Sequence, residues 1–348
     1  MRTTSGRTLR VGVIGTGFGA TVHVPAFKAA PEFDVVAVVS GHKANAERVA
    51  AEHDIGWSGD DYRAMLREVD LDVVSIAVSG GLHHEMALAA AAAGKHILCE
   101  KPFAASLTEA RDMLAAVRSA GVGHAVNHEF RMNPARQVFR RMVDDGYLGT
   151  TFDVRALLDV GMLLNPARTW SWWSDRAQYG GMLQAMTSHL IDFLLWTFGD
   201  IDHLSGRLDT FIRSRPTSDG THKDVTSDDA NAALLKFASG ASGLIYVTGA
   251  ARTQRSIVEA HGSEGTLSID SNRLFAAREP GKLEAVDTPE AQRPVGLMTA
   301  YLSHVAQVFG GETDPNVATF EQGVRVQAVM DAIHQSSEAG GSRIQVSK

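Results

Sequence analysis

The chain has 348 residues, which is too many for one ordinary hydrophobic core, so we expect two domains. Hydrophobic residues make up 44% of it and charged residues 21%, as in a soluble globular protein. Its net charge of −7 argues against nucleic acid or an anionic membrane as the main partner. The single cysteine, Cys99, cannot form an internal disulfide and favours a reducing cytoplasm.

The segment Met1–Thr8 is polar and lacks the apolar core of a signal peptide, so we expect a loose tail there. From Leu9 to Asn127, short apolar runs alternate with amphipathic segments. Repeated β-α units of this length predict a doubly wound parallel sheet over residues 8–127. The predicted strands are Leu9–Gly15, Asp34–Ser40, Leu71–Val78, His96–Glu100 and Val122–Asn127, and the predicted helices are Phe18–Ala30, Ala44–Asp54, Asp60–Glu68, His83–Gly94 and Ser106–Ala120.

Beyond Asn127 several predicted strands follow one another, which is typical of an α+β domain built on a mainly antiparallel sheet. We assign residues 128–348 to this second domain. The polar stretch Arg213–Asp228 is expected to be a mobile loop. The predicted strands are Thr151–Asp159, Asp229–Phe237, Gly243–Thr248, Ser256–His261 and Thr266–Asp270, and the predicted helices are Pro134–Asp145, Met182–Phe198 and Val317–Ala339.

A glycine-rich turn joins the first predicted strand to the first predicted helix. Its glycines permit a tight turn and let a pyrophosphate approach the backbone, while the N–H groups at the helix N-terminus can bind phosphate oxygens. Because strand, turn and helix occur in this order, the pattern indicates dinucleotide binding by a Rossmann-type domain. The residues of the turn are Gly15, Thr16, Gly17, Phe18, Gly19 and Ala20.

The end of the second predicted strand distinguishes NAD from NADP. An NAD site usually has Asp or Glu there to bind the ribose 2′-hydroxyl. This chain has Ser40, Gly41, His42 and Lys43 instead, and Asp34 lies at the opposite end of the strand. A hydroxyl and basic side chains suit the 2′-phosphate of NADP better, although His42 and Lys43 could equally begin a solvated loop. We therefore expect NADP in preference to NAD.

Glu100, Lys101 and Pro102 follow the strand-like run that ends at Cys99. Open α/β sheets hold their ligands at the carboxyl ends of the strands, so the Lys101 ammonium is expected close to a ligand. Taken alone, the tripeptide is more typical of a loop ion pair before a proline that starts a helix, and its position after the strand is what favours a ligand site.

His189 lies on the predicted helix Met182–Phe198, on the same face as the apolar Ala185 and Phe193. A histidine on such a face is often a packed core residue. Asp192 lies one turn further on, close enough to contact the imidazole, and its simpler interpretation is a carboxylate on the helix surface.

Three further side chains are candidates for substrate contact. Trp172 and Trp173 could stack on a sugar ring, although tryptophans also anchor ordinary cores. Arg131 could bind a carboxylate or phosphate, or lie on the surface.

His83-His84 and the group His124, His128 and Glu129 lack a metal-ligand spacing, so we expect no metal site.

Taken together, these segments resemble the glucose–fructose oxidoreductase/inositol dehydrogenase (Gfo/Idh/MocA) family. The shared features occur in family order over Leu9–Asp270, whereas Ser271–Lys348 matches only loosely. They are GTGFGA, VSIAV with LHHEMAL, GKHILCEKP, NHEFRMNPA, GGMLQAMTSHLID, DDANAALLKFASG and HGSEGTLSID.

The resemblance implies NAD(P)-dependent oxidation of a secondary alcohol, or the reverse reduction, on a sugar or cyclitol. Lys101 corresponds to the family's active-site lysine, and His189 to the histidine that relays the hydroxyl proton. Asp192 and His83 also fit the family pattern, and Glu100 and Pro102 belong to the motif that carries the lysine. Val78 is expected beside the cofactor, in a Val78-Ser79-Gly80 turn that replaces the Thr-Pro-containing turn usual in the family. By resemblance alone, we also expect a homo-dimer or homo-tetramer.

A more serious departure from the family pattern lies on the predicted helix that carries His189. Active members typically have an aspartate four residues before the histidine, where this chain has Ala185. Asp192 or a substrate carboxylate could take over the role of this aspartate, which would shift the substrate preference away from simple inositols. Two interpretations of the whole chain remain. In the first, the chain is a dehydrogenase in which His189 is the base and Lys101 polarises the oxygen. In the alternative, it is a non-catalytic NADP-binding sensor or regulator with the same fold.

Overall fold

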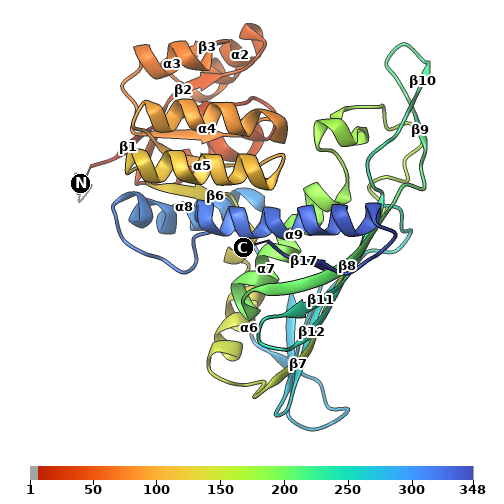
Figure 1. The fold of residues 1–348 in the computed structure, drawn as a ribbon. Coiled ribbons are helices and arrows are strands. Elements are labelled where there is room, and N and C mark those ends of the chain that lie inside the picture. Colours follow the sequence, from red (N-terminus) through yellow and green to blue (C-terminus); the bar gives the residue numbers. More distant parts are fainter. Residues whose placement is uncertain (1–6, 348) are drawn as a thin grey trace. The chain divides into compact units, whose positions relative to one another are not determined.

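The computed structural model describes residues 7–347 and divides into two compact units (Figure 1). The first comprises Met1–Met132 and Gln292–Val324, and the second comprises Asn133–Ala291 and Arg325–Lys348. The expected tail Met1–Thr8 lies mostly outside the described residues. We predicted that all of residues 128–348 form the second domain. In the structure, Gln292–Val324 packs with the first unit instead.

The first unit is built on a six-stranded parallel sheet in the order β3-β2-β1-β4-β5-β6. This confirms the predicted doubly wound sheet. Its strands are short and apolar because both faces of the sheet are buried. They are β1 (Leu9–Ile14), β2 (Phe33–Val39), β3 (Trp57–Gly59), β4 (Val73–Ile76), β5 (His96–Cys99) and β6 (His124–Val126).

Helices cover both faces of this sheet. One core joins apolar side chains of α1, α2 and α8 to the sheet, and a second joins those of α3, α4 and α5. Helix α8 belongs here because Met298, Tyr301 and Leu302 are buried against Val24 and Phe27. The helices are α1 (Val24–Ala29), α2 (Lys43–His53), α3 (Tyr62–Glu68), α4 (His83–Ala92), α5 (Leu107–Ala120) and α8 (Pro294–Phe309), with shorter helical segments at η1 (Gly19–His23), η2 (Gly80–Leu82) and η3 (Glu129–Met132).

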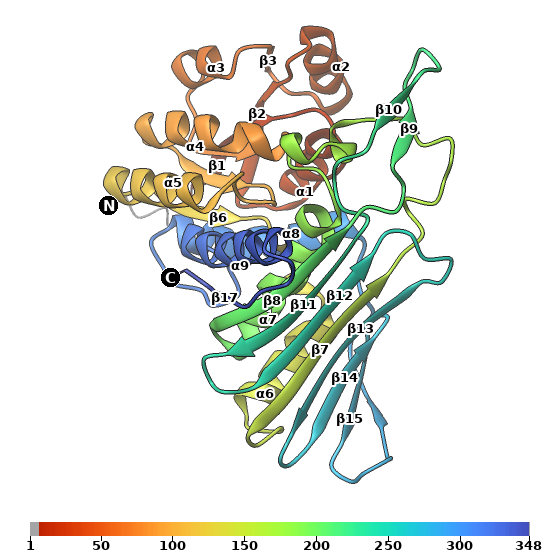
Figure 2. The ribbon, with the colours of Figure 1, turned by 45° about the vertical axis from the view of Figure 1, so that its right-hand side comes forward.

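The second unit is built on a nine-stranded, mainly antiparallel sheet in the order β16-β15-β14-β13-β7-β12-β11-β8-β17, as expected for an α+β domain (Figure 2). Its one parallel pair among the described strands is β12 with β7. The strands are β7 (Thr151–Asp159), β8 (Ile201–Asp209), β11 (Ala230–Phe237), β12 (Ser242–Thr248), β13 (Arg255–Gly262), β14 (Thr266–Asp270), β15 (Arg273–Ala277), β16 (Glu284–Val286) and β17 (Ile344–Gln345).

The sheet of the second unit carries helices α6 (Pro134–Asp144) and α7 (Ser188–Phe198) on one face (Figure 2). A π-helix, η6 (Leu183–Thr187), precedes α7, and α9 (Phe320–Glu338) crosses the division between the units. The stretch Arg213–Asp228 was expected to be a loop, but it contains a hairpin of β9 (Ser214–Pro216) and β10 (His222–Asp224). Of the helices that the structure describes, none has the length and apolarity to span a membrane.

Candidate active site

The predicted cofactor residues follow neighbouring parallel strands of the first unit. Ile14 pairs with both Val39 and Ile76, and Cys99 pairs with both Ile76 and Val126. The strands β1, β2, β4, β5 and β6 therefore end side by side. The turn at 15–20, the segment at 40–43, Val78 and the turn at 100–102 all emerge from this carboxyl edge, where doubly wound sheets bind their ligands.

The glycine-rich turn has the backbone that dinucleotide binding requires. Gly15 has a φ of +115°, and a Cβ there would lie 2.1 Å from the Ala77 carbonyl oxygen, so this position demands glycine. A Cβ on Gly17 would meet nothing within 4 Å, which leaves the backbone open to a pyrophosphate. The helix after the turn begins as a π-helix with Phe18 at its N-cap. These features fit a bound dinucleotide.

The tip of β2 carries polar and basic groups. The Thr16 hydroxyl donates to the Ser40 hydroxyl at 2.9 Å, and Gly41, His42 and Lys43 are exposed. Helix α2 begins at Lys43 with His42 at its N-cap.

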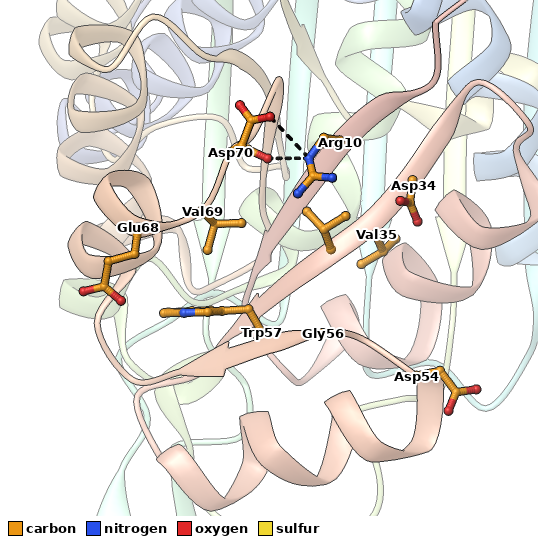
Figure 3. A pocket seen from close by; sticks show the side chains of 10 residues that line it. Arg10, Asp34, Val35, Asp54, Gly56, Trp57, Glu68, Val69 and Asp70 are labelled. Carbon is orange, nitrogen blue, oxygen red and sulfur yellow. Dashed lines mark hydrogen bonds and ion pairs between the residues drawn. The ribbon is translucent and has the colours of Figure 1, made fainter.

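The nearest acidic residue in β2, Asp34, is at the other edge of the sheet. There it lines a cavity of about 430 Å³ together with Arg10, Trp57 and Asp70 (Figure 3). Asp34 therefore cannot take the place of the carboxylate that usually binds the NAD ribose.

The turn after β5 rests on a buried polar cluster formed by His23, Ser75, Glu100 and Asn127. Nε2 of His23 donates to Oε1 of Glu100 at 2.8 Å, and Asn127 donates to the same oxygen at 2.6 Å. Nδ1 of His23 shares a 2.8 Å hydrogen bond with the Ser75 hydroxyl. The backbone N–H of Lys101 donates to Oε2 of Glu100 at 3.2 Å. Sequence reasoning missed His23, Ser75 and Asn127.

His83 joins two turns at this edge. Its ring is fully buried, with Nε2 3.1 Å from the Val78 carbonyl and Nδ1 3.0 Å from the Pro102 carbonyl. Burial lowers the pKa of His83 despite these carbonyl contacts. This packing favours a supporting role for His83, since the ring nitrogens face protein carbonyls. The peptide bond between Lys101 and Pro102 is cis.

In the second unit, His189 and Asp192 lie on α7 and are buried. Ala185, at the position of the family's aspartate, lies on the preceding π-helix. The start of that helix is held by Asp228, whose Oδ2 accepts hydrogen bonds from the Leu183 N–H at 2.9 Å and from Asn231 at 3.0 Å.

Asp228 was not singled out from the sequence. It lines a cavity of about 140 Å³ with His334, Arg176 and Thr210. Gly181 has a φ of +112°, and a Cβ there would lie 2.0 Å from Oδ1 of Asp228, so the close approach of this carboxylate depends on glycine.

The remaining candidates are divided between the units. Trp172 and Trp173 lie in the second, with ring centroids 5.7 Å apart, and the guanidinium of Arg168 lies 5.2 Å from the Trp173 ring. Trp172 is 37% exposed, as a stacking platform would need. Arg131 lies in the first unit, is 1% exposed and donates to the Pro315 carbonyl at 3.4 Å. Within residues 7–347, no group of three or more His, Cys, Asp or Glu side chains is arranged to hold a metal ion.

Two family models match the chain. The first, described as an oxidoreductase family with an NAD-binding Rossmann fold, matches residues 9–128. The second, a GFO/IDH/MocA C-terminal domain, matches residues 137–268. The two matches follow one another along most of the chain.

Among curated proteins, the chain is 33% identical to an uncharacterized oxidoreductase of Synechocystis sp., over 78% of this chain and 74% of that protein. It is 30% identical to levoglucosan dehydrogenase of Pseudarthrobacter phenanthrenivorans, over 77% of this chain and 75% of that protein. It is 28% identical to D-apiose dehydrogenase of Paraburkholderia graminis, over 82% of this chain and 74% of that protein.

Solved structures agree with these relationships. A levoglucosan dehydrogenase in complex with NADH and L-sorbose superposes with a TM-score of 0.90 at 27% identity, covering 98% of this chain and 100% of that chain. An oxidoreductase domain protein from Kribbella flavida has the same TM-score of 0.90 at 28% identity, covering 98% of this chain and 100% of that chain.

Proposed function

Because the chain belongs to the GFO/IDH/MocA family of oxidoreductases, we propose that it transfers a hydride between NADP and a secondary alcohol or ketone of a sugar or cyclitol. The observation that carries this proposal is the carboxyl edge of the first unit, where the open glycine turn and the Lys101 turn emerge from neighbouring strands. The names of the dehydrogenases that it resembles support a sugar-type substrate.

The proposed mechanism separates a hydride from a proton. When bound, the nicotinamide cofactor supplies the hydride acceptor for oxidation or the donor for reduction. As the carbinol C–H bond breaks, the hydroxyl proton must also leave, and we assign its removal to the imidazole of His189. The Lys101 ammonium donates a hydrogen bond to the same oxygen and stabilises negative charge on it. In oxidation, the proton passes to His189 and the hydride to the cofactor, and the carbinol becomes a carbonyl group.

The preference for NADP over NAD is supported by the tip of β2. A 2′-phosphate would find the Ser40 hydroxyl, the side chains of His42 and Lys43 and the N-terminus of α2, which favours anions. A charged hydrogen bond contributes about 1.5–3 kcal/mol, so we expect NADP to bind roughly 10- to 100-fold more tightly than NAD. Titration calorimetry would contradict this if NAD bound equally well or better.

Two further parts of the proposal concern the state of the protein. We propose a homo-dimer or homo-tetramer, because the sheet of the second unit exposes Leu234 and Tyr246, which are 64% and 39% exposed. We propose a cytoplasmic location because the single cysteine, Cys99, is a buried thiol whose pKa burial raises, as suits a residue that takes no part in disulfides.

The function is tested by turnover. Levoglucosan, D-apiose, 1,5-anhydro-D-fructose and inositols would be screened with NADP and NAD by absorbance of the reduced nicotinamide. On the best substrate, Lys101→Ala should lower kcat/KM by about 10²–10³-fold, and His189→Ala by about 10²–10⁴-fold.

Lys95→Ala is the matched control, because Lys95 lies before β5, at the opposite edge of the sheet, and its ammonium donates to the Leu71 carbonyl. It should stay near wild-type activity. Unchanged activity in Lys101→Ala would exclude the lysine's role, and an absence of turnover with every compound would contradict the proposed reaction.

A further inference from the structure

The first unit contains a buried polar cluster directly beneath the turn that carries Lys101. Its members come from four places in the chain: His23 ends η1, Ser75 lies in β4, Glu100 follows β5 and Asn127 follows β6. His23 and Ser75 are fully buried, Asn127 is 0% exposed and Glu100 is 5% exposed. Each of the four side chains makes at least one hydrogen bond within the cluster, which offsets the cost of burying it.

Glu100 is an anion at the centre of this cluster. Burial alone would raise its pKa, but the hydrogen bonds from His23 and Asn127, together with the positive charge of Lys101, lower the pKa of Glu100 to about 2. Three donors hold the carboxylate: Nε2 of His23, the side-chain amide of Asn127 and the backbone N–H of Lys101. An ionised carboxylate buried in this way is strongly oriented.

The fixed carboxylate determines where the Lys101 side chain begins. It anchors the backbone N–H of Lys101 and presents a negative charge next to the ammonium. His23 in turn fixes the carboxylate, and Ser75 orients the imidazole from its other nitrogen. We propose that His23 is a positioning residue for Lys101 that acts through Glu100, an inference that rests on the proposed role of Lys101 in hydride transfer.

His23 also belongs to the helix that follows the glycine-rich turn. The same five-residue π-helix therefore begins beside the proposed phosphate-binding backbone and ends on the support of the lysine. This explains why a histidine is useful at this buried position, which an apolar residue could fill equally well if only packing mattered. The distinction between filling space and holding Glu100 is what an experiment must test.

Three variants of the full-length chain separate these roles. His23→Leu keeps an apolar side chain in the space but removes both hydrogen bonds. His23→Gln keeps an amide that can donate to Glu100 and accept from Ser75. His96→Leu is the matched control, because His96 is a partly buried histidine at the start of β5 that accepts a hydrogen bond from the Gly123 N–H at 2.8 Å.

The first measurement needs no substrate. The chain has eight lysines, so ¹³C-lysine labelling gives a spectrum in which Lys101→Arg identifies the Cε signal of Lys101. We expect that signal to move in His23→Leu, to return close to its wild-type position in His23→Gln and to stay unchanged in His96→Leu. An unmoved signal in His23→Leu, or an equal movement in His96→Leu, would overturn the proposal.

The second measurement uses the sugar with the highest turnover in the screen. His23→Leu should lower kcat by roughly 10- to 100-fold, as expected for a misplaced catalytic group, while KM and the Kd of NADP stay within about 3-fold. His23→Gln should recover most of kcat. Equal kcat in wild type and His23→Leu would refute the proposal, as would a loss confined to KM. If no sugar is turned over, the proposed function fails, and the lysine spectrum still decides the positioning role.

Discussion

At the scale of single residues, Asp228 is a buried carboxyl group of the second unit with a raised pKa. It is 7% exposed, and burial raises its pKa to about 7 although hydrogen bonds from Asn231 and Leu183 act in the opposite direction. The native state therefore keeps this proton between the ordinary value of 3.8 and about 7, where the unfolded chain has lost it. The contribution of Asp228 to stability is therefore fully present below its ordinary pKa and is lost as the pH rises through this interval.

We predict that Asp228→Asn removes this loss of stability. Asparagine can accept the same two hydrogen bonds through its side-chain oxygen without an ionisable proton. At pH 4 the variant and wild type should have similar unfolding free energies, and by pH 8 the variant should be more stable by roughly 2–4 kcal/mol. Thermal unfolding followed at several pH values measures the difference.

Asp224→Asn is the control, since Asp224 lies at an exposed position in β10 of the same unit. Its melting temperature should follow that of wild type across the pH range. A constant gap between Asp228→Asn and wild type from pH 4 to pH 8 would show that Asp228 does not hold a proton in the native state.

Functional residues that stand in short sequence motifs could be predicted from the sequence. Residues that belong to a hydrogen-bond network formed by distant parts of the chain could not. Gly15 and Lys101 stand in short motifs whose chemistry follows from neighbouring residues. Asn127 reaches Glu100 only because β5 and β6 are paired, and His23 reaches it from a helix 77 positions earlier in the chain. A histidine on the face of the first helix and an asparagine at a strand end were the available signals, and both have commoner explanations.

At the scale of elements, α5 shows how sequence-local interactions fix a helix end. The Ser106 hydroxyl accepts from the Glu109 N–H at 3.3 Å, and the Glu109 carboxylate accepts from the Ala105 N–H at 3.1 Å. This arrangement resembles a capping box, except that Glu109 accepts from the residue before the N-cap and not from the N-cap itself. The helix ends at Ala120, before Gly121 with a φ of +65°.

We predict that Ser106→Ala destabilises the first unit by about 1 kcal/mol, because the N–H of Glu109 loses its acceptor. Ser106→Asp, which restores an acceptor, should differ from wild type by less than about 0.5 kcal/mol. Urea unfolding at constant pH measures both. Equal stability of the alanine and aspartate variants would mean that the cap contributes nothing here.

Elements whose role depends on distant packing were harder to predict. Helix α8 was not predicted at all. Its place in the first unit depends on side chains such as Met298 and Tyr301, which pack in one core with α1, as Thr299 contacts Ala26 of α1 across 273 positions. The strands β9 and β10 consist of polar residues and one proline, so their sequence resembles a loop. In contrast, β7 alternates between more and less buried side chains over part of its length, and β14 buries its three central side chains. The predicted bounds of both strands match the structure.

At the scale of the whole molecule, the large sheet presents apolar side chains on its outer face. Leu234 pairs with Leu244, Ala232 pairs with Tyr246, and Tyr246 pairs with Leu157, so these side chains lie on the same face. The alternate residues, including Leu235 and Ile245, are buried. A contiguous apolar face of this kind is usually covered by a partner protein. The face therefore supports the proposed self-association.

We predict that Leu234→Arg weakens this association at least about 10-fold, because a charge in an apolar interface must be desolvated. Sedimentation velocity across a range of protein concentrations should show a smaller species for the variant than for wild type. Leu283→Arg is the matched control, since Leu283 is 52% exposed and lies in the connection between β15 and β16. A wild type that is monomeric at every concentration would refute self-association, and equal dissociation by both variants would place the interface elsewhere.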